Sequence, residues 1–138
     1  MGGRRSDAIP ETDKQMEDQL SFVLTKKNPI VKNWPVTIPV PMDDGAVRPH
    51  KIGLDFEIPP ADDVIERLGT LSADVDSDRK AKDFLAEMTH GWHDVVHEDK
   101  SPVEFTEEGF RQLLNLPFAG PAIQAAYLDC LRGRKAKN

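Results

Sequence analysis

The 138-residue chain is long enough for one hydrophobic core but short for two domains, and its 38% hydrophobic and 30% charged residues are typical of a globular protein. Its net charge of −6 argues against a nucleic-acid partner, because nucleic-acid binders need a basic surface to neutralise phosphates. With no apolar run as long as a membrane span, no secretion signal and a single cysteine, we expect a cytoplasmic protein without disulfides or a membrane partner.

A polar arm and a short strand are expected at the N-terminus. Residues 1–19 carry too little apolar surface to offset the entropy of ordering, which predicts a flexible arm. Leu20, Phe22 and Leu24 then share one face of an extended segment and predict a short strand. The same stretch also fits one face of a helix, which is the alternative.

Two further segments alternate as the strands of a hairpin. In residues 34–41, Val36, Ile38 and Val40 share one face, whereas prolines hold three of the four alternate positions. Proline has no N–H to donate, so we expect this strand at an edge of the sheet. Residues 50–58 alternate in the same way, and an Asp-Asp-Gly turn separates the two segments, which predicts an antiparallel hairpin.

Helical periodicity replaces strand alternation in the second half of the chain. A first short helix is predicted over residues 61–68, ended by Gly69, and a second begins at residue 76 or 77. Gly91 has the position of a left-handed terminator for the second helix. The apolar stripes of these helices are Ala61, Val64, Ile65 and Leu68 in the first, and Ala81, Phe84, Leu85 and Met88 in the second.

Two more helices are predicted in the C-terminal third. Thr106 has the position of an N-cap, two glutamates follow it, and Phe105 and Phe110 have the spacing of a hydrophobic staple. The last helix begins near Pro121 and runs to Gly133 with a wide apolar surface.

Together these elements predict an α+β fold, in which a small antiparallel hairpin or three-stranded sheet is followed by about four short helices. We expect a single domain over residues 20–133. Four basic side chains lie close to the C-terminus, and residues 134–138 are expected to form a solvated basic tail.

No arrangement of residues predicts catalysis or a bound cofactor. Cys130 lies in an alanine-rich segment without a neighbouring histidine to activate it, and no Gly-x-Ser-x-Gly or phosphate-binding motif is present. His90, His93 and His97 form a candidate metal cluster, since His93 and His97 would lie one turn apart on an unbroken helix. Because Gly91-Trp92 interrupts that helix, we favour solvated or partner-facing histidines over a small metal-dependent enzyme or regulator.

The last helix carries more apolar surface than a small hairpin needs. For any one of these residues, completing the core is the simpler interpretation. As a group, some of them are candidates for a groove that binds a partner helix, or for a self-association face. The candidates are Phe118, Ile123, Tyr127, Leu128 and Leu131.

The order and spacing of several short segments also carry a family resemblance. The first half contributes residues 24–29 and 35–41, an acidic turn with glycine, and an alternating strand that ends at Phe56. The second half adds Gly91-Trp92, residues 102–108, Ala126-Tyr127-Leu128 and the terminal Lys137-Asn138. Over about residues 20–138, the chain resembles the tail assembly chaperones of long-tailed bacteriophages.

The resemblance implies a protein of virion morphogenesis that binds and solubilises the tape measure protein, associates with itself and is absent from the mature virion. It also implies a longer form, made by programmed ribosomal frameshifting, that recruits the tail tube subunit. Residues 136–138 are compatible with the codons GCA AAA AAC, which contain a slippery A-AAA-AAC heptamer. A structural neck or tail protein of the phage is the other alternative.

Overall fold

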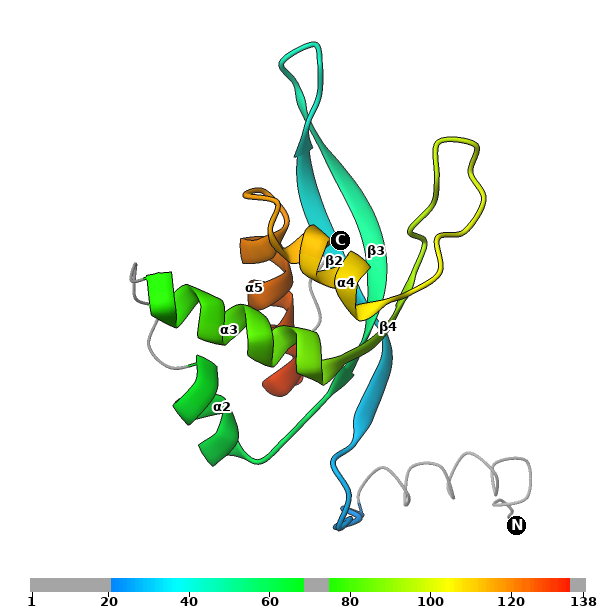
Figure 1. Ribbon diagram of the computed structural model, residues 1–138. Coiled ribbons are helices and arrows are strands. Elements are labelled where there is room, and N and C mark those ends of the chain that lie inside the picture. The colour runs from blue at the N-terminus through cyan, green and yellow to red at the C-terminus, as the bar shows by residue number, and fades with distance from the viewer. Residues whose placement is uncertain (1–20, 69–74, 135–138) are drawn as a thin grey trace, which may run out of the picture.

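The computed structural model describes residues 21–68 and 75–134, which form three strands and four helices (Figure 1). The strands are β2 (Ile30–Pro41), β3 (Val47–Glu57) and β4 (Thr89–His93), in one antiparallel sheet with the order β2-β3-β4. The helices are α2 (Ala61–Leu68), α3 (Val75–Met88), α4 (Glu107–Leu114) and α5 (Gly120–Leu131). The predicted α+β class is confirmed. No helix within the described ranges is long and apolar enough to cross a membrane.

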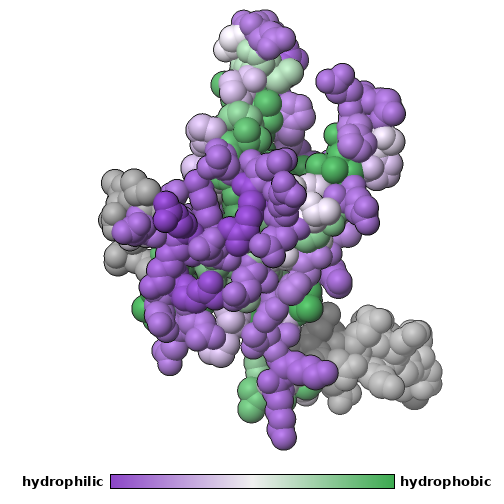
Figure 2. Space-filling model, in the orientation of Figure 1, coloured by the Kyte–Doolittle hydropathy of each residue, from purple (hydrophilic) through white to green (hydrophobic). Residues whose placement is uncertain are grey.

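The β2–β3 hairpin follows the sequence pattern closely. Trp34, Val36 and Ile38 of β2 are buried, whereas the prolines that alternate with them are exposed. As predicted, β2 lies at an edge of the described sheet. In the turn, Gly45 has φ 86° and its N–H donates to Met42 O over 3.0 Å. The hairpin projects beyond the helices, and hydrophobic side chains remain visible along it (Figure 2).

The third strand is not the one that the sequence predicts. Residues 21–24 belong to no strand, so the strand expected from Phe22 and Leu24 is wrong, while Leu20 lies outside the described residues. β4 pairs with β3 and completes the sheet instead. The physical reason lies in β2, whose prolines leave too few N–H groups on its outer side for another strand to pair there.

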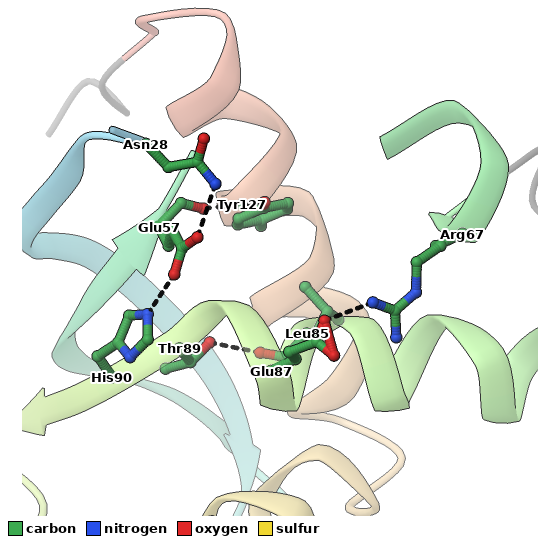
Figure 3. Close-up of polar contacts among 8 residues, drawn as sticks. All are labelled: Asn28, Glu57, Arg67, Leu85, Glu87, Thr89, His90 and Tyr127. Carbon is green, nitrogen blue, oxygen red and sulfur yellow. Dashed lines mark hydrogen bonds and ion pairs between the residues drawn. The ribbon is translucent and has the colours of Figure 1, made fainter. Parts of the chain in front are cut away.

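β4 begins directly after α3, where the sequence predicts a helix terminator. Thr89 Oγ1 donates to Leu85 O over 2.7 Å and closes the last turn of α3 (Figure 3). Gly91 is not among the described residues with positive φ, so the predicted left-handed cap is wrong. Its lack of a side chain serves the sheet, because a Cβ there would lie 2.7 Å from Asp55 Oδ2.

The hydrophobic core fills the space between the sheet and the helices, with Tyr127 of α5 at its centre. The Tyr127 ring packs edge-on against Phe56 and Phe84, with centroid distances of 5.0 and 5.9 Å. The four apolar residues predicted for the α3 stripe are all buried. The α2 stripe is only partly right, because Leu68 is buried whereas Ile65 is 69% exposed.

The helix starts in the C-terminal third agree with the sequence. Thr106 Oγ1 accepts the N–H of Gly109 over 2.9 Å as the N-cap of α4, and the Phe105 and Phe110 rings lie 6.0 Å apart. The chain leaves α5 through Gly133, whose φ is 69°. The expected arm over residues 1–19, the expected helix end at Gly69 and all but the first residue of the expected 134–138 tail lie outside the described residues.

Candidate functional site: a groove between α3 and α5

An apolar groove lies where α3, α5 and the turn after α4 meet. Its volume is about 480 Å³, within the range of roughly 300 to 1,000 Å³ that is usual for binding sites. We call it the α3–α5 groove. Its apolar lining is Leu85, Leu114, Leu116, Pro117, Gly120, Pro121, Ala125 and Leu128, and its polar lining is Asp78, Lys82, Asn115 and Gln124.

The turn between α4 and α5 forms one wall of the groove. Asn115 is the C-cap of α4, and Leu116 O then accepts the N–H groups of Ala119 and Gly120, each over 3.0 Å. Glycine suits this tight turn, because a Cβ on Gly120 would lie 2.4 Å from Leu114 O. The reversal leaves the Leu116 side chain 40% exposed. The backbone thus holds an apolar residue at the rim of the groove.

Gln124 of α5 lines the groove and carries an unpaired hydrogen-bond donor beneath its surface. Its Nε2 atom is buried and has no hydrogen-bond partner in the described part of the chain. A buried donor without a partner costs about 1 to 3 kcal/mol, and an acceptor on a bound molecule would recover that free energy only once the Gln124 side chain turns to expose Nε2 to the groove. A carbonyl oxygen within an apolar peptide has the required chemistry.

Polar side chains close one side of the groove. Lys82 Nζ lies 2.9 Å from Asp78 Oδ2 and donates to Asn115 Oδ1 over 3.2 Å. In the adjoining hollow, Arg111 donates to Asp83 over 2.6 Å, and this carboxylate is the main cause of the raised pKa of Arg111. An apolar floor with a polar rim is the usual organisation of a protein–protein contact.

The five partner-binding candidates have separate places in the fold. Leu128 lines the groove. Ile123 and Tyr127 are both 0% exposed, so they build the core, and the prediction that they contact a partner does not fit this structure. Phe118 and Leu131 are half-buried and pack against the core. The candidates separate because α5 meets the sheet with one side and the groove with another.

Of the twelve residues that line the groove, only Leu128 is among the candidates from the sequence, and Leu116, Pro117 and Gln124 illustrate why the others are missed. Leu116 and Pro117 lie in the turn between helices, where neither strand nor helix periodicity applies. A Leu-Pro pair in a short interhelical turn was the available signal, because an apolar side chain there has no helical stripe to join. Gln124 resembles an ordinary polar position on a helix, and only the packing of α5 shows its burial.

The three candidate metal-binding histidines do not converge. His90 Nε2 lies 2.7 Å from Glu57 Oε1 (Figure 3), and His93 Nε2 lies 2.8 Å from Asp55 Oδ1. His97 is exposed in the loop that follows β4. Across residues 21–68 and 75–134, no three histidine, cysteine or acidic side chains form a group that could hold a metal ion.

Asp55 is the centre of a polar cluster on the sheet face away from the core. Its Oδ1 atom accepts the N–H of Asn33, a residue at a β2 irregularity with φ 54°, over 2.8 Å. Burial works against its charge, but the Asn33 N–H and His93 outweigh burial and lower the pKa of Asp55. Gly53 leaves room for the cluster, because a Cβ there would overlap the Asn33 side chain. We call Asp55, Asn33 and His93, with Lys32 at 4.0 Å, the Asp55 cluster.

The single cysteine is part of the core. Cys130 is buried in α5, and burial raises the pKa of its thiol. A thiol that stays protonated is a poor nucleophile. Its placement is therefore that of a small hydrophobic side chain.

Comparisons with known proteins add no family to these observations. No protein-family model matches the sequence, no curated protein matches it, and no solved structure matches the chain. The groove and the order of the sequence segments are therefore the grounds for assigning a function.

Proposed function

We propose that this protein is a tail assembly chaperone of a long-tailed bacteriophage or prophage, which binds and solubilises the tape measure protein during tail morphogenesis. The observation that carries the proposal is the α3–α5 groove, with its apolar floor, polar rim and unpaired donor. The resemblance of the sequence segments supplies the identity of the client. The proposal assigns neither catalysis nor a cofactor to the chain.

A helical client suits the chemistry of the groove. An amphipathic helix presents apolar anchors one turn apart, which an apolar groove can receive along its length. The last carbonyl groups of a helix have no partner within the helix. The C-terminal turn of a client helix therefore offers an acceptor for Gln124 Nε2 once that buried amide turns toward the groove.

Modest contacts suit a protein that must coat its client and then leave. Burying one large apolar anchor contributes about 1.5 to 3 kcal/mol, whereas association costs at least about 4 kcal/mol. A single groove that receives two or three anchors therefore binds weakly. Repeated sites along a long client supply strength through avidity, while each copy can still be displaced by polymerising tube subunits.

The proposal places the protein in the host bacterial cytoplasm and outside the mature virion. Self-association is part of it, and the net charge of −6 would keep loaded complexes apart by repulsion. A longer, frameshifted form would recruit the tail tube subunit. The alternative of a structural neck or tail protein differs in one measurable respect, since mass spectrometry of purified virions would then detect the chain.

Co-expression with a tape measure polypeptide from the same phage or prophage tests the proposal. We expect the two chains to copurify and the soluble fraction of the tape measure protein to rise. Leu116→Asp and Ala125→Arg place a charge in the groove and should abolish both effects. Ile65→Asp changes an exposed apolar residue on α2, away from the groove, and should preserve both effects as the matched control.

Two results would overturn the proposal. One is a wild-type chain that neither binds the tape measure polypeptide nor changes its solubility. The other is a groove variant that retains full binding although its charge lies within the lining. Equal thermal unfolding midpoints for all three variants would exclude misfolding as the cause of lost binding.

A further inference from the structure

A bulge separates the first residues of β2 from the rest of the strand. The register of β2 against β3 shifts between Val31 and Trp34. Lys32 and Asn33 therefore lie opposite Asp55 alone. Asn33 has φ 54°, a left-handed backbone conformation that most side chains disfavour. We call Lys32 and Asn33 the β2 hinge.

The chain before the β2 hinge is attached to the sheet through residues 28–31, which we call the 28–31 segment. Asn28 Nδ2 donates to Glu57 Oε2 over 2.7 Å (Figure 3). Pro29 O accepts the N–H of Ile58 over 2.9 Å. The last two residues of the segment pair with the end of β3. A small set of contacts at one end of β3 therefore holds the segment in place.

The stretch over residues 21–27 adds no polar contact to this attachment. Each of its residues is exposed, and it runs clear of the helices at the end of the sheet opposite the hairpin turn (Figure 1). Thr25 Oγ1 donates to Lys27 O over 2.9 Å within the stretch itself. No hydrogen bond or ion pair joins the stretch to the other residues that the structure describes. It can therefore move together with the 28–31 segment.

We propose that two copies of the protein exchange their 28–31 segments, so that each copy places its segment on the β3 end of the other. The part of β2 after the hinge stays in place, because Trp34, Val36 and Ile38 are buried in the core. Rotation at the β2 hinge releases the segment and lets Asn33 leave its left-handed conformation. Short hinges under strain favour exchange of this kind.

A second copy is the partner because the place on β3 already has a defined occupant. Val31 is half-buried against the core, and Glu57 and Ile58 direct a carboxylate and an N–H group at the segment. A segment that only opened would leave these groups uncovered or unpaired, which is unfavourable. The identical segment of a second copy restores the same contacts with the same charges. Exchange between identical chains is thus a low-cost route to a dimer.

The exchange is reciprocal, since each copy gives one segment and receives one. Its product is a closed dimer with two-fold symmetry. The contact would serve the self-association that is part of the proposed function, but it does not depend on the identity of the client. The 28–31 segment and the α3–α5 groove share no residue, so exchange and client binding are separate events.

Two hinge variants that differ by one methyl group test the exchange. Asn33→Gly accepts the left-handed conformation at no steric cost and should keep the segment on its own copy, whereas Asn33→Ala disfavours that conformation and should promote exchange. Sedimentation velocity of the full chain should give a dimer dissociation constant about tenfold lower for Asn33→Ala than for Asn33→Gly, because each dimer releases two hinges. Equal dissociation constants, or monomers in both variants at all concentrations, would overturn the inference.

Crosslinking identifies the contact directly. In a Cys130→Ala background, an Ile30→Cys protein is concentrated with a differently tagged Glu57→Cys protein and then oxidised. The two positions are register partners, so exchange brings them together in a mixed dimer and should give a disulfide between the tagged chains. In the control mixture, Ile65→Cys replaces Ile30→Cys, because Ile65 is exposed on α2. Disulfides that form equally fast in both mixtures would reflect random collision and would contradict the exchange.

A single chain that carries both Ile30→Cys and Glu57→Cys separates this inference from the proposed function. Oxidised at low concentration, it locks the segment on its own sheet and should remain monomeric, yet still capture the tape measure polypeptide through its groove. A locked chain that dimerises as strongly as its reduced form would overturn the exchange and leave the proposed function intact. A mixed disulfide between copies of a protein that captures no tape measure polypeptide would overturn the proposed function alone.

Discussion

The Asp55 cluster and the α3–α5 groove both contain a buried polar group, but they differ in how that group is satisfied. The Asp55 carboxylate is completed by its own chain, through the Asn33 N–H and the His93 ring. The Gln124 Nε2 donor has no such partner among the described residues, and leucines line the groove beside it. A polar group that the fold satisfies stabilises the fold, whereas an unsatisfied one requires a partner that the described chain does not supply.

The largest expected effect is the loss of stability when the carboxylate of the Asp55 cluster is removed. Asp55→Ala leaves the Asn33 N–H without its charged acceptor and should lower the free energy of unfolding by about 1.5 to 3 kcal/mol, measured by urea denaturation. Client capture should be unchanged at temperatures where the variant is folded. His93→Gln is the control, and it should cost less because the His93 side chain is 44% exposed. Lost capture by folded Asp55→Ala would make the cluster part of the binding surface.

In the groove, Gln124→Met should raise the free energy of unfolding, which is the opposite of the change expected for Asp55→Ala. Methionine has a similar shape but no N–H group, so the cost of the unpaired donor disappears and the free energy of unfolding should rise by about 1 to 2 kcal/mol. Binding to the client should weaken, because the client carbonyl loses its donor. Gln112→Met changes an exposed glutamine of α4 and should alter stability by less than about 0.5 kcal/mol. A fall in stability for Gln124→Met would show that the amide is already paired.

The parts of the fold that depend on local chemistry could be predicted from the sequence. The prolines of β2 lack N–H groups wherever the strand lies, so they define an edge. Thr106 can cap α4 with only the three residues that follow it. The start and end of α5 also depend on proline and glycine within one turn of the helix.

The parts that depend on distant segments could not be predicted. Gly91 has the same local pattern as a helix terminator, and only the approach of Asp55 explains why it lies in a strand. The apolar surface of α5 is wide enough to be read in several ways, so Tyr127 and Leu128 could not be assigned to core and groove before their neighbours were known. Burial of Gln124 likewise depends on packing that no spacing of residues reports.

Substitutions at two neighbouring positions of α5 should distinguish its core-facing side from its groove-facing side by smaller changes in stability and in client capture. The Tyr127 hydroxyl donates to Glu57 O over 3.1 Å, so Tyr127→Phe should lower the free energy of unfolding by about 0.5 to 1.5 kcal/mol. Because the side chain is 0% exposed, capture of the client should not change. Leu128→Gln, one residue further along, should weaken capture more than it lowers stability. A binding defect in folded Tyr127→Phe would return Tyr127 to the partner-binding residues.

The smallest expected effect is the acid sensitivity of the Asp55 cluster. The pKa of Asp55 is lowered in the folded protein, because the Asn33 N–H and His93 together outweigh the opposing effect of burial. Its ionised form therefore favours folding, and this contribution is complete above the ordinary pKa of about 4 and is lost as the pH falls through the lowered folded value. The pKa of Glu57 is lowered as well, first by the Asn28 side chain and then by His90, so acid also weakens the wild type at a second site.

Comparing the wild type with Asp55→Asn isolates the contribution of Asp55 to the acid dependence of the free energy of unfolding, because Glu57 is present in both proteins. The difference in the free energy of unfolding between wild type and variant should shrink as the pH falls below about 4, measured by urea denaturation at each pH. A difference that grows on acidification would mean that burial prevails over the hydrogen bonds of Asp55. The matching difference between wild type and Gln124→Met should show no acid step of this kind, because the Gln124 amide has no proton to gain in this range.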